Sequence, residues 1–129
     1  MSNSLYADLV GKPFKLGGHG PDYYDCGGLV KEILTRLGQP PLDFNSLVSI
    51  RAREGEIEQA LLGFESIDNI DPPCVLAFYN EHGFVAHAGV AISKDWFIHT
   101  CKSVGYVNLE RLSGDWICRI AKIYKLKSA

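Results

Sequence analysis

The sequence predicts a single α+β domain in which N-terminal helices pack on a mainly antiparallel β-sheet. The chain has 129 residues, of which 47% are hydrophobic and 22% charged, as in an ordinary globular domain. Apolar residues recur at helical spacing in the first half, and the second half holds runs rich in β-branched and aromatic residues. Helices followed by consecutive strands are typical of this fold class. We assign residues 1–129 to one domain.

A short helix is expected near the N-terminus. Asn3 or Ser4 is a suitable N-cap, and Gly11 followed by Pro13 ends the helix. Its apolar positions are Tyr6, Leu9 and Val10. The next segment, residues 14–25, is rich in glycine and aromatic side chains and is predicted to form a loop.

The best supported helix covers residues 26–37. Asp25 can serve as its N-cap, and Gly38 is placed to stop it. The apolar residues at helical spacing are Leu29, Val30, Ile33, Leu34 and Leu37. Residues 46–62 are predicted to form two further helical pieces separated near Gly55. The apolar stripe of these pieces is marked by Ile57, Leu61 and Leu62.

The second half of the chain has the periodicity of strands. Residues 64–73 are predicted to be a turn-rich connector that leads into them. The expected strands cover residues 75–79, 84–92, 96–101, 106–109 and 117–126. The turns between them include residues 81–83, 93–95 and 113–115.

Charge and composition exclude several classes of function. A net charge of −2 leaves no electrostatic footprint for nucleic acid. The sequence contains no apolar run long enough to span a membrane and no secretory leader, so we expect synthesis in the cytoplasm without a signal peptide. The 4 cysteines lack the close spacing of zinc ribbons and of thioredoxin-like motifs, so reduced thiols are expected.

Cys26 stands where the glycine-rich loop becomes a helix. A thiol is a strong nucleophile only as the thiolate, which the unpaired N–H groups and partial positive charge of a helix start favour. Cys26 is therefore expected to be more reactive than Cys101, which lies on a predicted strand. The alternative is a small buried residue that only packs at the start of the helix.

Two histidines are predicted to share one face of the sheet. If residues 93–95 form a symmetric turn, His87 lies opposite Cys101, and Gly89 lies opposite His99. His87 and His99 are then diagonal neighbours, roughly 7–8 Å apart at the backbone and within side-chain reach. Gly89 would leave space beside them.

This pair of imidazoles fits a cysteine nucleophile. One imidazole can take the thiol proton while the next group holds that imidazole in the right tautomer. Two alternatives stay open: histidines that are merely hydrogen-bonded in the core, and a zinc site. The zinc ligands would be His87, His99, Cys101 and Cys26.

Several segments together resemble the NlpC family of papain-like cell-wall cysteine peptidases. Residues 11–18 and 25–30 look like the signature around the nucleophile of that family. The later segments follow in the family's order: residues 75–79 before the base, 85–92 as the base-bearing strand, 96–100 as the strand of the third catalytic residue, and 116–124 as the closing strand. The resemblance implies a papain-like sheet of about five to six strands.

Carried over residue by residue, the resemblance makes Cys26 the nucleophile, His87 the general base and His99 the orienting third member. It implies that the backbone N–H of Cys26 contributes to an oxyanion hole. Family members hydrolyse amide bonds in the peptide stems of peptidoglycan, often after a D-glutamyl residue. The resemblance implies no metal and no organic cofactor.

The residues expected to contact substrate depart from the family pattern at two positions. The family commonly has serine after the nucleophile, where this chain has Gly27, and tyrosine where it has Phe14. Since both usual residues help to recognise substrate in relatives, these departures bear on substrate specificity and leave the expected catalytic residues intact. The other expected contacts are Asp25, which is retained, His19 in the glycine loop, and Tyr24 or Tyr23, which can restore a hydroxyl.

Without a secretory leader, a cell-wall enzyme needs another way of delivery. A bare catalytic domain fits a phage or prophage tail component, a toxin carried by a secretion machine, or a fragment of a longer protein. Residues 105–112 resemble the phage tail group, whose members act on the cell wall once delivered. The alternatives are a weakly active or inactive papain-like module for binding or assembly, and an amidase, deamidase or acyltransferase on a non-wall substrate.

Overall fold

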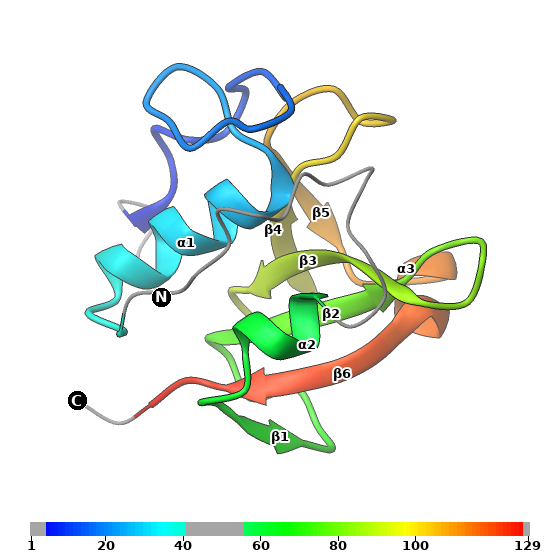
Figure 1. The fold of residues 1–129 in the computed structure, drawn as a ribbon. Helices are drawn as coiled ribbons and strands as arrows, with labels where there is room; N and C mark the ends of the chain where they lie inside the picture. Colours follow the sequence, from blue (N-terminus) through cyan, green and yellow to red (C-terminus); the bar gives the residue numbers. More distant parts are fainter. Residues whose placement is uncertain (1–4, 41–55, 128–129) are drawn as a thin grey trace.

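The computed structural model describes residues 5–40 and 56–127, which form a six-stranded antiparallel sheet with two helices on one face (Figure 1). The helices are α1 (Cys26–Arg36), α2 (Glu56–Ala60) and α3 (Asp115–Arg119). The strands are β1 (Glu65–Ile67), β2 (Cys74–Tyr79), β3 (Val85–Ala91), β4 (Trp96–His99), β5 (Asn108–Arg111) and β6 (Ile120–Lys125). Their order in the sheet is β1-β6-β2-β3-β4-β5. The predicted α+β class is confirmed.

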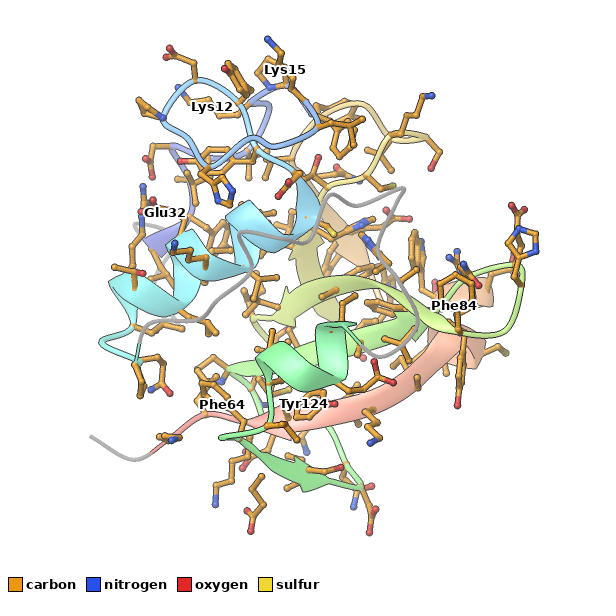
Figure 2. The ribbon with its side chains drawn as sticks, in the orientation of Figure 1. Lys12, Lys15, Glu32, Phe64, Phe84 and Tyr124 are labelled. Carbon is orange, nitrogen blue, oxygen red and sulfur yellow. The ribbon has the colours of Figure 1, made fainter. Side chains whose placement is uncertain are left out.

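The sheet is covered on both faces, which explains the continuous apolar run of β2. Alternate side chains of a strand face opposite sides, and residues 74–78 are all buried. Val75 and Ala77 join the larger apolar cluster beneath α1 and α2, whereas Leu76 and Phe78 join a smaller cluster on the other face. Figure 2 shows Phe64 and Tyr124, both from the larger cluster, together beneath α2.

Helix α1 forms where the sequence predicted it. Asp25 has an extended backbone and its carboxylate accepts the N–H of Gly28, so it is the predicted N-cap. The helix ends one residue before Leu37, and Gly38 takes a φ of +73°, which favours glycine. Arg36 in the last turn pairs with Asp8 at 2.7 Å and so ties the N-terminal segment to the helix.

The predicted N-terminal helix is wrong over residues 6–11, which form successive turns, whereas Leu5 is in a 3₁₀ conformation. Hydrogen bonds from Leu9 N to Tyr6 O and from Lys12 N to Leu9 O close these turns. The N–H of Gly11 then donates to Val107 O at 2.8 Å, which draws the chain toward the segment before β5 instead of into a helix. The proposed caps Asn3 and Ser4 lie outside the described residues.

The second predicted helical region is described only from residue 56 onward. Its later piece is present as α2, whereas the earlier piece and the break at Gly55 lie outside the described residues. Ile57 and Leu61 are buried, but Leu62 is 75% exposed because α2 has already ended at Ala60. The prediction that Leu62 belongs to the apolar stripe is therefore wrong.

Two strand assignments also need correction. Part of the predicted connector is β1, which pairs with β6 at the sheet edge, and its mostly exposed side chains conceal the strand pattern. The predicted final strand begins instead at Ile120, because the turn at Gly114 leads into α3. The strand expected over residues 106–109 is shifted to β5. Within the described ranges, no helix is both long and apolar enough to cross a membrane.

Candidate active site

Cys26 is the first residue of α1 and is 2% exposed. The loop before it is fixed by backbone bonds, including one from the N–H of Asp25 to Gly18 O at 2.9 Å. The carboxylate of Asp25 accepts Gly28 N at 2.6 Å and Gly17 N at 3.1 Å. Asp25 therefore connects the glycine-rich loop to the first turn of the helix and sets the position of the thiol between them.

The thiol of Cys26 is held in its neutral form. Burial, and next the negative charge of Asp25, raise its pKa to about 12, although backbone N–H groups of Ala88 and Gly27 oppose this shift. The prediction that the helix start makes this thiolate favourable is wrong for the resting structure, because desolvation outweighs the helix terminus. The Ala88 contact also places the sulfur beside the backbone of β3, at the residue that follows His87 in the strand.

The two predicted histidines lie in hydrogen-bond contact. The turn at residues 93–95 pairs Val90 with Ile98 and Ala91 with Phe97, which is the register that the symmetric turn predicts. Nε2 of His87 lies 3.0 Å from Nδ1 of His99, and both side chains are buried. A Cβ on Gly89 would come within 2.9 Å of the Ile98 carbonyl oxygen and 3.0 Å of the His99 Cβ, so the predicted space beside the histidines is filled by the close approach of β4.

His87 is kept neutral by its surroundings. Burial, then the neighbouring His99 and the charge of Arg119, hold the pKa of His87 well below its usual range. Its ring contacts Phe78 and Trp116 at centroid distances of 5.5 Å and 5.7 Å. A neutral imidazole has one nitrogen with a free electron pair, so His87 can accept a proton. Within the described part of the chain, its thiol neighbour Cys26 is not hydrogen-bonded to it.

Glu110, which the sequence did not predict as a site residue, completes a chain of polar contacts. Its Oε1 lies 2.8 Å from Nε2 of His99 and accepts Asn108 Nδ2 at 3.2 Å, while Oε2 accepts Trp116 Nε1 at 2.6 Å. Burial alone would raise the pKa of Glu110, but these three donors outweigh it and lower that pKa. The sequence signal that could have identified Glu110 is its position two residues after Asn108, which puts both side chains on one face of a strand. The predicted strand ended at Leu109, one residue too early to include it.

Cys101 has the more acidic thiol. It follows β4, where burial would raise its pKa, but the neighbouring His99, the Ser103 hydroxyl and the N–H of Val104 lower that pKa to about 7. Its Sγ lies 3.2 Å from Oγ of Ser103. The two ring nitrogens of His99 are hydrogen-bonded to His87 and Glu110. Cys101 lies near this imidazole but takes the place of neither partner. The helix start therefore does not give Cys26 the more favourable thiolate of the two, contrary to the expectation from the sequence.

The zinc alternative finds no arrangement to support it. Over residues 5–40 and 56–127, no group of three or more histidine, cysteine, aspartate or glutamate side chains is placed to hold a metal ion. His99 uses both ring nitrogens on His87 and Glu110, so neither is free to ligate.

The residues expected to contact substrate are gathered around the loop before α1. Backbone bridges join Tyr24 to Phe14 and to His19, and the His19 side chain is exposed. Gly27 and Tyr24 are buried, and Asp25 is fully buried with both carboxylate oxygens used by backbone N–H groups. The structure thus gives Asp25 a capping role, and the substrate contacts stay predictions.

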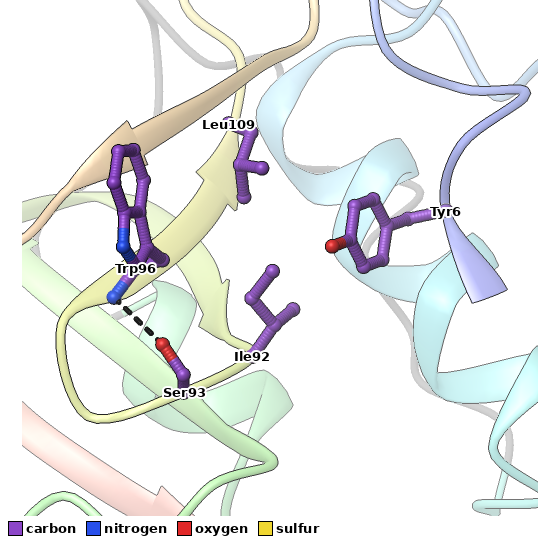
Figure 3. Close-up of a pocket in the computed structure, with 5 residues that line it drawn as sticks. All are labelled: Tyr6, Ile92, Ser93, Trp96 and Leu109. Carbon is purple, nitrogen blue, oxygen red and sulfur yellow. Dashed lines mark hydrogen bonds between the residues drawn. The ribbon is translucent and has the colours of Figure 1, made fainter. Parts of the chain in front are cut away.

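A separate cavity of about 280 Å³ lies on the opposite face of the β4–β5 pair (Figure 3). Trp96 and Leu109, which alternate with the residues facing the histidines, form part of its wall together with Tyr6, Ile92 and Ser93. These side chains supply no thiol, imidazole or carboxylate, so this cavity is distinct from the candidate active site.

Comparisons with known proteins agree with this architecture. The chain matches the fold of NlpC1 from Trichomonas vaginalis at a TM-score of 0.67 and 22% identity, covering 93% of this chain and 41% of that one. It matches the NlpC/p60 domain of the peptidoglycan hydrolase SagA at a TM-score of 0.65 and 15% identity, covering 95% of this chain and 93% of that domain. It matches the peptidoglycan hydrolase RipB from Mycobacterium tuberculosis at a TM-score of 0.62 and 12% identity, covering 97% of this chain and 63% of RipB. No curated protein shows a significant sequence match.

These structural matches establish the fold, and the sequence itself establishes the family. The chain spans less than half the length of NlpC1, so the activity of that whole protein does not transfer to it. The model of the NlpC/P60 family, in contrast, matches residues 11–122, which include the helix-start cysteine, both histidines and Glu110. The chain therefore belongs to the NlpC/P60 family.

Proposed function

We propose that this protein is a cysteine peptidase that hydrolyses amide bonds in the peptide stems of peptidoglycan, with Cys26 as nucleophile, His87 as base and His99 as the residue that orients it. The observation that carries the proposal is the contact of 3.0 Å between Nε2 of His87 and Nδ1 of His99. That bond uses one nitrogen of His87 and leaves Nδ1 without a partner among the described residues.

In the proposed reaction, Nδ1 of His87 takes the proton of the Cys26 thiol as the sulfur attacks the carbonyl carbon of the substrate amide. Because the pKa of Cys26 is raised and that of His87 lowered, proton transfer accompanies the attack instead of preceding it as a stable ion pair. His87 then gives this proton to the leaving amine, and a thioester remains on Cys26. Water, deprotonated by His87, attacks the thioester and releases the carboxylic acid and the thiol.

Two of the structural neighbours are peptidoglycan hydrolases, which supports this substrate class for a member of the same family. Gly27 and Phe14 stand where relatives commonly carry hydroxyl side chains, so we propose a specificity for the stem peptide that differs from theirs. Delivery by a phage tail or a secretion machine remains a prediction from the sequence.

A second candidate function is a papain-like module that binds stem peptides without cutting them. The neutral, buried thiol of Cys26, which is not hydrogen-bonded to His87, favours this candidate. A binding module would release a muropeptide unchanged, whereas a peptidase would release its cleavage products.

The deciding experiment is digestion of purified muropeptides, followed by mass spectrometry of the products. We expect the wild-type protein to yield a new amine and a new carboxyl at one amide, and Cys26→Ala and His87→Ala to yield neither while remaining folded. Cys118→Ala, which removes an exposed thiol on α3, is the matched control and should cut normally. More than roughly a tenth of wild-type turnover in Cys26→Ala would overturn the assignment, because loss of a nucleophile costs orders of magnitude in rate. Binding without cleavage by the wild type would favour the second candidate.

A further inference from the structure

We propose that Glu110 is a positioning residue that fixes the tautomers of His99 and His87, so that the free electron pair of His87 lies on Nδ1. This inference rests on the proposed function only for the use of that electron pair as a base. The arrangement of protons itself can be measured without any activity.

The tautomers follow from one carboxylate. An ionised carboxylate is only an acceptor, so Nε2 of His99, 2.8 Å from Oε1 of Glu110, carries a proton. With one proton on the ring, Nδ1 of His99 is an acceptor, and Nε2 of His87 at 3.0 Å must donate to it. The one proton of the His87 ring is then on Nε2, and its Nδ1 holds the free electron pair.

Glu110 is itself held in the orientation that this requires. It lies on β5 diagonally from His99, because His99 pairs with Asn108 in the sheet. Asn108 donates to the same oxygen as His99, and the indole of Trp116 donates to the other at 2.6 Å. Three N–H donors, two on Oε1 and one on Oε2, hold the carboxylate in the orientation that faces the imidazole.

The aromatic rings around His99 restrict the imidazole in the same way. Phe97 stacks on it at a centroid distance of 4.4 Å and an interplanar angle of 20°, and Trp116 meets it edge-on at 4.7 Å. His99 is fully buried between them, and its two nitrogens are hydrogen-bonded to His87 and Glu110. A change at Glu110 therefore acts on His87 through His99.

Replacing Glu110 with glutamine keeps its size but supplies one oxygen for three donors. If the amide NH₂ faces His99, Nε2 of His99 must accept, Nδ1 must donate, and His87 loses its free electron pair on Nδ1. If the amide NH₂ faces Trp116 instead, it opposes the indole N–H, and one buried donor stays unsatisfied. Either arrangement weakens the single proton order that the carboxylate imposes.

The first measurement is long-range ¹H–¹⁵N NMR of histidine-labelled protein in the Cys26→Ala background, which removes any turnover. Replacing the exposed His19 and His82 with glutamine leaves only the two buried imidazoles to assign. We expect the proton on Nε2 in both rings, and a mixture of tautomers once Glu110→Gln is added. A proton on Nδ1 of His99, alone or together with Nε2, or tautomers that Glu110→Gln leaves unaltered, would overturn the proposal.

The second measurement is the kinetics of muropeptide cleavage. Glu110→Gln should lower kcat by at least roughly tenfold, as expected when a general base is disturbed, with little change in KM. Glu65→Gln, an exposed residue on β1, is the charge-matched control and should leave both constants unchanged. In a His99→Asn background, Glu110→Gln should add nothing, because the two residues act in series. Additive losses, or an unchanged kcat, would contradict the proposal.

The two measurements separate the two hypotheses. If the wild type cuts no muropeptide but the NMR shows both protons on Nε2 under the control of Glu110, the proposed function fails and the assignment of Glu110 stands. If cleavage occurs but Glu110→Gln changes neither the tautomers nor kcat, the proposed peptidase function is supported and the inference about Glu110 fails.

Discussion

Gly28, in the first turn of α1, lies against the backbone carbonyl of Gly18, so that a Cβ on Gly28 would collide with that oxygen. Gly28→Ala must therefore push the loop away from the helix start that carries Cys26. We expect a loss of unfolding free energy of about 1–3 kcal/mol, typical of overpacking, measured by urea denaturation.

The matched control for this change is Gly63→Ala. The nearest atom to a Cβ there is Nζ of Lys127 at 3.3 Å, the far end of a flexible side chain that can move. Equal stabilities of the two variants would show that the contact between Gly28 and Gly18 does not constrain the loop.

The thiols are expected to react in an order opposite to that predicted from the sequence. At pH 7.5, iodoacetamide should label Cys101, whose pKa is about 7, well before Cys26, whose pKa is about 12, because only the thiolate reacts. Peptide mapping by mass spectrometry gives the rates, and urea-unfolded protein should lose the difference. Faster labelling of Cys26 would show that its thiol is less buried, or its thiolate better stabilised, than the structure indicates.

High reactivity toward an alkylating agent is distinct from catalysis, so Cys101→Ser should keep muropeptide cleavage within a few-fold of wild type. The reason is that Nε2 of His99, its neighbouring imidazole, is taken up by Glu110 and cannot serve Cys101 as a base. A mechanism-based inhibitor should attach to Cys26. Attachment to Cys101, together with loss of cleavage in Cys101→Ser, would show that Cys101 is the nucleophile and that the assignment of Cys26 is wrong.

Acid should destabilise the fold through His87. The pKa of His87 in the folded protein is lowered by burial and then by His99 on β4 and Arg119 on α3. At a pH between this folded-state pKa and the unfolded-state pKa, the unfolded chain therefore binds more protons than the folded protein. The stability is full above an unfolded pKa of about 6.5 and falls as the pH drops below it, by up to about 2 kcal/mol at pH 5. Urea denaturation at pH 7 and pH 5 measures this loss. His87→Gln, which does not titrate, should show a smaller loss, and an equal one would place the acid sensitivity elsewhere.

His99 should tolerate asparagine better than alanine. The Oδ1 of asparagine can accept the Nε2–H of His87, whereas alanine leaves that donor unpaired in a buried site. Turnover of muropeptides should therefore fall in the order wild type, His99→Asn, His99→Ala, with His87→Ala lowest. Equal and total loss in all three variants would mean that His99 does more than orient.

The sequence was sufficient to predict the elements that carry the predicted catalytic residues. Capping by Asp25 and the apolar spacing of α1 are local properties, and the register of His87 and His99 follows from a short turn and the alternation of strand side chains. These signals need only a few neighbouring residues, so they can be read without the fold.

Glu110 and the thiol pKa values depend on contacts between distant segments. Glu110 reaches His99 only because β5 pairs with β4, and Trp116 reaches Glu110 only because α3 replaces the first residues of a predicted strand. The helix start at Cys26 suggested a stabilised thiolate, but the burial that reverses this comes from the packing of β3 against α1. Desolvation is a property of the assembled core, and a local pattern does not contain it.

The position of Trp116 gives this protein an optical sensor of its own. Its indole meets His99 edge-on and contacts the ring of His87, and its N–H is bonded to Glu110. Protonated imidazole quenches indole fluorescence on contact, so the emission of Trp116 will follow the charge on His87. The chain has 2 tryptophans, and the other, Trp96, points to the opposite face of the β4–β5 pair. Trp96→Phe would therefore leave a single emitter whose signal reports the protonation of the site during titration and turnover.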